Sequence, residues 1–145
     1  MAQRILLAED EPNIVESLRF LLTRAGFEVD VRDNGRQALE TALAAPPDIM
    51  VLDVMLPEMD GFEILTRLRA NPDTMDMPVL MLTAKGQRED RERALEKGAN
   101  RFISKPFGNA ELIEAVRLLA SPSTLSADVP SEESEPGIAS SPTSR

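Results

Sequence analysis

Carboxylate side chains follow two short apolar segments of the chain, and they are the groups best placed to carry chemistry. Residues 5–8 lead into Glu9 and Asp10, and residues 49–52 lead into Asp53. The chain has no histidine and no cysteine, which excludes thiol nucleophiles, serine–histidine triads and zinc sites with the usual ligands. Close carboxylates without histidine suit a hard, oxygen-preferring cation, so Asp10 and Asp53 form a candidate Mg²⁺ site.

Asp53 has apolar neighbours on both sides, and burial of its charge costs free energy unless a cation or hydrogen-bond donors meet it. Two later apolar segments deliver Thr83 and Lys105 to the ends of their strands. Each polar residue alone has an ordinary explanation, since Asp10 or Glu11 could cap the next helix and a lone Thr or Lys is usually structural or solvated. Together, a metal ion, an ammonium and a hydroxyl around a carboxylate are what phosphoryl transfer onto that carboxylate requires.

These side chains act together only if the fold brings the ends of the apolar segments to one edge. Residues 1–120 alternate short apolar segments with longer stretches of helical period. The expected strands cover residues 5–8, 27–31, 49–52, 79–82 and 101–103. The expected helices cover residues 12–25, the region of 38–43, a stretch between Gly61 and Pro72, residues 87–97 and a last segment that includes 112–119.

Strict alternation of strands and helices predicts a doubly wound α/β fold, in which helices cover both faces of a parallel sheet. Residues 27–31 alternate polar and apolar side chains, as an edge strand does, so the predicted strand order is 2-1-3-4-5. Ligands of such sheets bind beyond the carboxyl ends of the strands where the winding reverses, here between the first and third strands. Glu9, Asp10 and Asp53 follow those two strands.

The composition limits the kinds of partner. The chain has 145 residues and a formal net charge of −9, which disfavours direct binding to nucleic acid or to an anionic membrane. No apolar run reaches the roughly 18 residues of a membrane helix, so a cytoplasmic location is expected. Residues 121–145 are rich in Ser, Pro and Glu and are expected to form a disordered tail after a single folded domain at residues 1–120.

Four segments, LLAEDE, IMVLDVMLPEMDGFEIL, PVLMLTAK and GANRFISKPF, resemble the receiver domain of bacterial two-component response regulators, the CheY-like family. The resemblance covers about residues 4–120 in one register and implies a flavodoxin-like (βα)5 fold. It implies that Asp53 accepts a phosphoryl group from a histidine kinase, a phosphotransfer protein or a small donor such as acetyl phosphate. Thr83 and Lys105 would then each contact a phosphoryl oxygen.

The resemblance also implies the ligands of one Mg²⁺ ion. Asp10 and Asp53 would bind the ion directly, Glu9 would bind it through water, and the backbone carbonyl of Met55 would complete the protein ligands. In the family, the side chains at the positions of Met55 and Lys85 control the access of water to the acyl phosphate. A Met and a Lys stem at these positions predict slow hydrolysis.

Phosphorylation adds about −1.5 to −2 charges and three acceptor oxygens, which should draw Thr83 toward Asp53. The resemblance implies that Phe102 then turns inward and changes the surface made by the fourth helix, fifth strand and fifth helix, to which a downstream protein binds. It further implies a cis Lys105–Pro106 bond. The phosphodonor protein would dock on the first helix and the loop around Pro106.

The leading interpretation is a stand-alone receiver that is phosphorylated and dephosphorylated only at its own Asp53 and has no enzymatic activity on other substrates. It would be a monomer or a phosphorylation-dependent dimer. Asn100–Arg101 replaces two acids frequent in dimerising relatives, which weakens the dimer hypothesis, although Arg91 and Glu111 could still pair.

Three alternatives remain open at this point. The chain could be the receiver fragment of a longer transcriptional regulator, or a receiver that is never phosphorylated. It could also be a Mg²⁺-dependent phosphatase with an aspartyl-phosphate intermediate. Phosphatases of the haloacid dehalogenase type place a second Asp where this chain has Met55, which argues against that activity.

Overall fold

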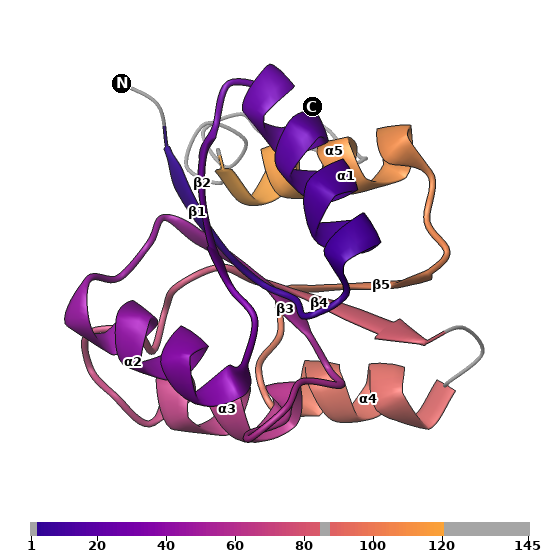
Figure 1. Cartoon of the computed structure of the whole chain (residues 1–145). Helices are drawn as coiled ribbons and strands as arrows, with labels where there is room; N and C mark the ends of the chain where they lie inside the picture. The colour runs from indigo at the N-terminus through magenta and orange to yellow at the C-terminus, as the bar shows by residue number, and fades with distance from the viewer. Residues whose placement is uncertain (1–2, 85–87, 121–145) are drawn as a thin grey trace, which may run out of the picture.

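The computed structural model describes residues 3–84 and 88–120, in which five strands alternate with five helices (Figure 1). The strands are β1 (Arg4–Ala8), β2 (Glu28–Arg32), β3 (Ile49–Asp53), β4 (Val79–Ala84) and β5 (Arg101–Lys105). The helices are α1 (Pro12–Arg24), α2 (Gly35–Ala44), α3 (Gly61–Arg69), α4 (Arg88–Glu96) and α5 (Asn109–Ala120). All four strand pairs are parallel and the order is β2-β1-β3-β4-β5, which confirms the predicted fold.

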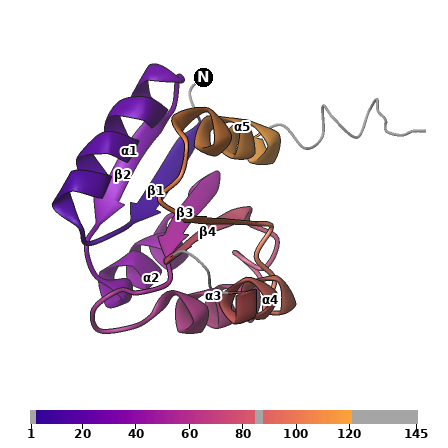
Figure 2. The same ribbon diagram turned by 90° about the vertical axis from the view of Figure 1, so that its right-hand side faces the viewer.

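Helices cover both faces of the sheet, with α1 and α5 on one side and α2, α3 and α4 on the other (Figure 2). Successive strand residues point to opposite faces, so each central strand supplies both cores. Met50, Leu52 and Met81 belong to the core under α2–α4, whereas Val51 and Ile103 belong to the core under α1 and α5. Two-sided burial explains why the central strands are almost wholly apolar.

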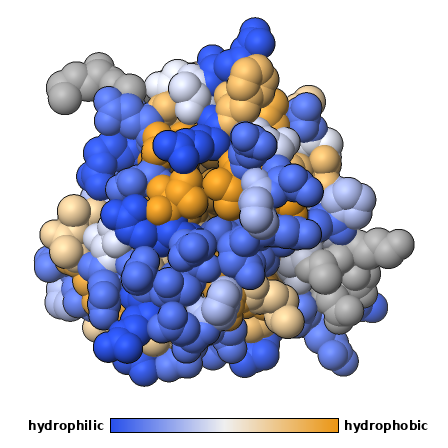
Figure 3. All heavy atoms as spheres, in the orientation of Figure 1, coloured by the Kyte–Doolittle hydropathy of each residue, from blue (hydrophilic) through white to orange (hydrophobic). Residues whose placement is uncertain are grey.

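Strand β2 lies at the edge of the sheet, as its alternating polarity predicted. All five residues of β3 are buried, whereas the residues of β2 are exposed or half-buried. Figure 3 shows a mostly hydrophilic face on which hydrophobic side chains gather between α1 and β2. The edge strand therefore shares its apolar side chains with α1 and leaves its polar ones in solvent.

Strands β3, β4 and β5 extend one or two residues further than their apolar segments predicted. The register pairs Asp53 with Leu82, Thr83 with Ser104, and Ala84 with Lys105. Backbone hydrogen bonds of a ladder do not depend on side-chain polarity, so a strand continues into its polar end where a neighbour is available. The polar residues singled out from the sequence are therefore held by the sheet itself.

Local signals fix the helix ends. Pro12 opens α1, and Asn34 and Asp60 accept hydrogen bonds from backbone N–H groups in the first turns of α2 and α3. Glu11 occupies the capping position of α1, but its side chain makes no capping hydrogen bond. The capping role considered for Asp10 and Glu11 is therefore absent, and the acids after β1 need another explanation.

Three expectations from the sequence fall on residues outside the described part: the tail at 121–145, the role of Lys85, and the first two residues of the folded domain. Within residues 3–84 and 88–120, no helix combines the length and the apolar character needed to cross a membrane.

Gly61, the first residue of α3, packs directly against the backbone at the end of β3. A Cβ at this position would lie 2.5 Å from the carbonyl oxygen of Asp53 and 3.0 Å from the Cα of Val54. We expect Gly61→Ala to lower the free energy of unfolding by about 1–3 kcal/mol, because backbone cannot move aside cheaply. Urea unfolding measures the change.

Gly108 provides the matched control, since a Cβ there would meet nothing within 4 Å. Gly108→Ala should change the unfolding midpoint little. Equal losses in the two variants would show that the contact between Gly61 and the β3 backbone does not limit stability.

Candidate functional site

Three carboxylates converge at the carboxyl ends of β1 and β3, the position predicted from the strand order. One carboxylate oxygen from each of Glu9, Asp10 and Asp53 lies within 4.8 Å of the others. The register that pairs Ala8 with Leu52 brings them together, because Glu9 and Asp53 are the next residues of two neighbouring strands. Glu9 and Asp53 are buried and Asp10 is exposed, so the cluster has one side open to solvent.

Lys105 brings a positive charge from the end of β5 to this cluster. Its Nζ atom donates a hydrogen bond to Asp53 Oδ2 at 3.0 Å and lies 3.2 Å from Glu9 Oε1. The other oxygen of Asp53 accepts a hydrogen bond from the backbone N–H of Met55 at 3.2 Å. Both oxygens of Asp53 are therefore held in place by donors.

Glu9 is less well satisfied than Asp53. Its Oε2 accepts a hydrogen bond from the backbone N–H of Glu11, but its buried Oε1 makes no hydrogen bond and has only the ion pair with the Lys105 ammonium at 3.2 Å. Burial, and then the negative charge of Asp53, raises the pKa of Glu9 to about 7.

The pKa of Lys105 moves in the direction that keeps it charged. Burial alone lowers this pKa, but the hydrogen bond and the charge of Asp53, together with the charge of Glu9, raise it above its ordinary value. One ammonium thus lies beside two of the three clustered carboxylates. A buried carboxylate oxygen without a hydrogen bond and an excess of negative charge fit a divalent cation with oxygen ligands, and an exposed Asp10 leaves room for water in its shell.

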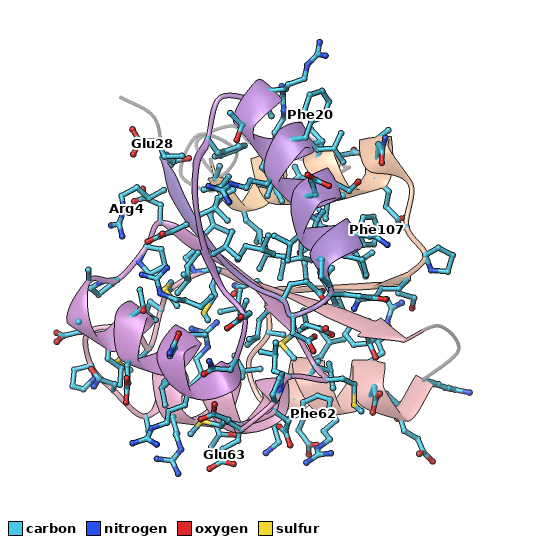
Figure 4. All side chains as sticks on the ribbon, in the orientation of Figure 1. Arg4, Phe20, Glu28, Phe62, Glu63 and Phe107 are labelled. Atoms are coloured by element: carbon cyan, nitrogen blue, oxygen red, sulfur yellow. The ribbon has the colours of Figure 1, made fainter. Side chains whose placement is uncertain are left out.

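An open pocket of about 560 Å³ adjoins Asp53 and Lys105. Its apolar wall includes Ile14 of α1 and, from the connection between β5 and α5, Pro106 and Phe107. Figure 4 shows Phe107 beside α1. The first helix and the loop around Pro106 were predicted to receive the phosphodonor, but Ile14 and Phe107 were not singled out, because a helix and a distant loop meet only in the folded chain.

Thr83 reaches the same edge of the sheet but does not contact Asp53. Its hydroxyl donates a hydrogen bond to Asp90 Oδ2 of α4 at 3.2 Å. Asp90 was not singled out from the sequence. Acidic residues are common in the first turn of a helix, and Glu89 beside it is a second one, so neither stands out as a site residue. Phe102 is half-buried and packs against the core under α2–α4.

The Lys105–Pro106 peptide bond is cis, as the resemblance implied. Asn100, which replaces a frequent acid, accepts hydrogen bonds from the backbone N–H of Val79 and from the guanidinium of Arg69. Its side chain is therefore engaged within the domain. The proposed pairing of Arg91 with Glu111 remains a prediction.

Comparison with known proteins points to one family. Residues 5–117 match the family model of the response regulator receiver domain. The transcriptional regulatory protein CusR of Escherichia coli K12 is 42% identical over 116 residues, which are 80% of this chain and 50% of CusR. The DNA-binding dual master transcriptional regulator RpaA of Synechocystis is 40% identical over 116 residues, 80% of this chain and 48% of RpaA. The chain thus spans about half the length of these relatives.

Solved structures give the same result. A putative response regulator from Chloroflexus aurantiacus superposes with a TM-score of 0.81 at 34% identity, covering 83% of this chain and 99% of that one. The receiver domain of the sensor histidine kinase PA1611 from Pseudomonas aeruginosa superposes with a TM-score of 0.76 at 33% identity, covering 83% and 100%. That structure holds a magnesium ion coordinated in its active site cleft.

Proposed function

Because the chain belongs to the response regulator receiver domain family, we propose that Asp53 is the residue that accepts the phosphoryl group of its two-component pathway. The observation that supports this most directly is the environment of Asp53. Its carboxylate is buried beside two other carboxylates and is held by the ammonium of Lys105 at 3.0 Å. A nucleophile oriented by fixed donors is prepared for in-line attack on phosphorus.

In the proposed reaction, a carboxylate oxygen of Asp53 forms a bond to the phosphorus of the donor. The bond from phosphorus to the donor's imidazole nitrogen, or to the acetate oxygen of acetyl phosphate, breaks, and that group leaves with the bonding electrons. The product is an acyl phosphate on Asp53. Lys105 lies close enough to pair with an oxygen of the transferred group and to offset its charge.

Glu9, Asp10 and Asp53, with the backbone carbonyl of Met55, are the groups that would hold a Mg²⁺ ion. The ion would neutralise charge on the phosphoryl oxygens during transfer. The fit rests on the convergence of the three carboxylates and on the unsatisfied oxygen of Glu9. Magnesium in the cleft of the similar PA1611 receiver supports the same assignment.

We assign the switch to Thr83 and Phe102, which lie on the side of the sheet that faces α4. Phosphorylation would draw Thr83 toward Asp53 and let Phe102 turn inward, which changes the α4-β5-α5 surface seen by a downstream protein. The phosphodonor would be a sensor histidine kinase or a phosphotransfer protein. Turnover would be confined to Asp53 itself, without hydrolysis of other phosphoesters.

The receiver part of a longer transcriptional regulator is a second candidate for the whole protein. It is supported by the relatives named as transcriptional regulators, of which the chain spans about half. The site chemistry is the same in both cases, because phosphoryl acceptance needs only the receiver.

Incubation with acetyl phosphate and Mg²⁺ tests the proposal. We expect the intact protein to gain the mass of one phosphoryl group, and excess EDTA to suppress the gain, because the three carboxylates then lack their divalent counter-charge. Acetate in place of acetyl phosphate is the donor control. A folded protein that stays unmodified with both donor and Mg²⁺ would refute the assignment, and steady release of phosphate from an aryl phosphate would favour the phosphatase.

A further inference from the structure

The side chain of Thr83 points to the opposite side of the sheet from Asp53, whose phosphoryl group it is proposed to contact. Along β4 it continues the row of Val79 and Met81, which belong to the core under α2–α4. Asp53 and Lys105 continue the rows of Val51 and Ile103, which belong to the core under α1 and α5. The hydroxyl of Thr83 must therefore leave the α4 side before it can reach a phosphoryl group on Asp53.

On the α4 side, the hydroxyl already has a charged acceptor. Thr83 is almost fully buried, and its Oγ donates to Asp90 Oδ2 at 3.2 Å. A hydroxyl has one proton and can donate one hydrogen bond at a time. A phosphoryl oxygen and the carboxylate of Asp90 consequently compete for the same donor.

The helix that carries Asp90 is weakly anchored to the core. Helices α3 and α4 both have nine residues, but α3 buries five of them and α4 buries only Ala94. Figure 4 shows Phe62 between α3 and α4, and the guanidinium of Arg93 lies 4.2 Å from the centre of its ring. Because α4 buries so little apolar surface, polar contacts such as that between Thr83 and Asp90 contribute much of the free energy that holds its first turn in position.

We propose that Asp90 is a positioning residue for the phosphoryl-transfer reaction: it holds the hydroxyl of Thr83 on the α4 side and so opposes its use by the phosphoryl group. This inference rests on the proposed function of Asp53. When Asp53 is phosphorylated, the hydroxyl leaves Asp90 for a phosphoryl oxygen, and the first turn of α4 loses its contact with β4. Asp90 thereby links phosphorylation of Asp53 to the position of α4.

Rates of phosphoryl gain from acetyl phosphate with Mg²⁺, followed by intact mass, test this role. We expect Asp90→Ala to be phosphorylated about 3- to 10-fold faster than the wild-type protein, because the hydroxyl of Thr83 no longer has to give up its hydrogen bond to Asp90. This fold-change corresponds to the free energy of one hydrogen bond to a charged group that solvent partly screens. Asp90→Asn keeps an acceptor but loses the charge, so its rate should fall between the two. It also serves as the conservative variant if removal of the side chain disturbs folding.

Glu89→Ala is the matched control, because Glu89 is the neighbouring acid in the same helical turn and has the same favourable interaction with the helix N-terminus. Its rate should stay within about twofold of wild type. In a Thr83→Ala background, Asp90→Ala should change nothing, since Asp90 acts through the hydroxyl. An effect that persists without the hydroxyl would overturn the inference, because it would show an action that does not pass through Thr83.

The two proposals fail in different ways. A wild-type protein that gains no phosphoryl group would refute the function of Asp53 and this inference with it. Normal phosphorylation of the wild-type protein, combined with equal or slower rates in both Asp90 variants, would refute the role of Asp90 alone.

Discussion

The Asp53→Asn variant is expected to gain no phosphoryl group under conditions that modify the wild-type protein completely. An amide oxygen is a far weaker nucleophile than a carboxylate oxygen, and an amide cannot form the acyl phosphate. The substitution keeps the shape of the side chain and its acceptor for the N–H of Met55. Intact mass after incubation with acetyl phosphate and Mg²⁺ measures the loss, and circular dichroism checks that the fold is kept.

Asp33→Asn is the matched control for this variant. Asp33 is an exposed aspartate that follows β2 at the same edge of the sheet, outside the cluster of Glu9, Asp10 and Asp53. It should be phosphorylated as the wild type is. If Asp53→Asn retained the mass gain while Asp33→Asn lost it, the acceptor would lie elsewhere.

The fold was predictable from the sequence because the two signals that specify it are local. Apolar segments such as 49–52 are short and unbroken where both faces of a strand are buried, and residues 27–31 alternate where only one is. Strand ends were predicted less well. A strand stops where its neighbour stops pairing, which depends on the register with another segment rather than on its own polarity.

The site was predictable as a set of positions but not as a set of contacts. Strand order alone places Glu9, Asp10, Asp53 and Lys105 at one edge, and the structure brings their side chains together. Side chains alternate along any strand, so the face of the sheet on which Thr83 lies could have been derived from its position in β4, but it was not predicted. Its partner could not be found in this way, since the position of α4 over the sheet depends on packing between distant segments.

Loss of the ammonium of Lys105 should have the largest effect on stability among the site variants. In Lys105→Met, the buried carboxylates of Glu9 and Asp53 lose the cation that lies 3.0–3.2 Å from both, and its charge no longer lowers the pKa of Glu9. Removing one partner of a buried pair costs about 3–5 kcal/mol. Because the Lys105 side chain is 21% exposed, we expect a loss of about 2–3 kcal/mol in urea unfolding with EDTA present.

Mg²⁺ should restore much of that loss, since it binds the folded cluster and supplies the missing positive charge. The same ammonium repels a divalent ion held by these carboxylates, so its removal should tighten Mg²⁺ binding on the order of tenfold. Calorimetry measures the affinity, because a chain without Trp or Tyr has no tryptophan or tyrosine fluorescence to report metal binding. Lys97→Met is the matched control, as the Nζ of Lys97 contacts Thr66 and no carboxylate of the cluster.

Two roles have been given to the acidic cluster: it needs Lys105 for stability, and it binds Mg²⁺. One result would support the first role and exclude the second, namely that Lys105→Met is destabilised in EDTA but is no better stabilised by Mg²⁺ than the Lys97→Met control. The carboxylates would then need Lys105 as a structural counter-charge without forming a metal site. The opposite result, tighter Mg²⁺ binding with slower phosphoryl gain, would show that Lys105 lowers metal affinity and yet aids transfer. Its ammonium contacts Asp53 at 3.0 Å and lies close enough to pair with a phosphoryl oxygen after transfer, so the cost in metal affinity is a direct consequence of that position.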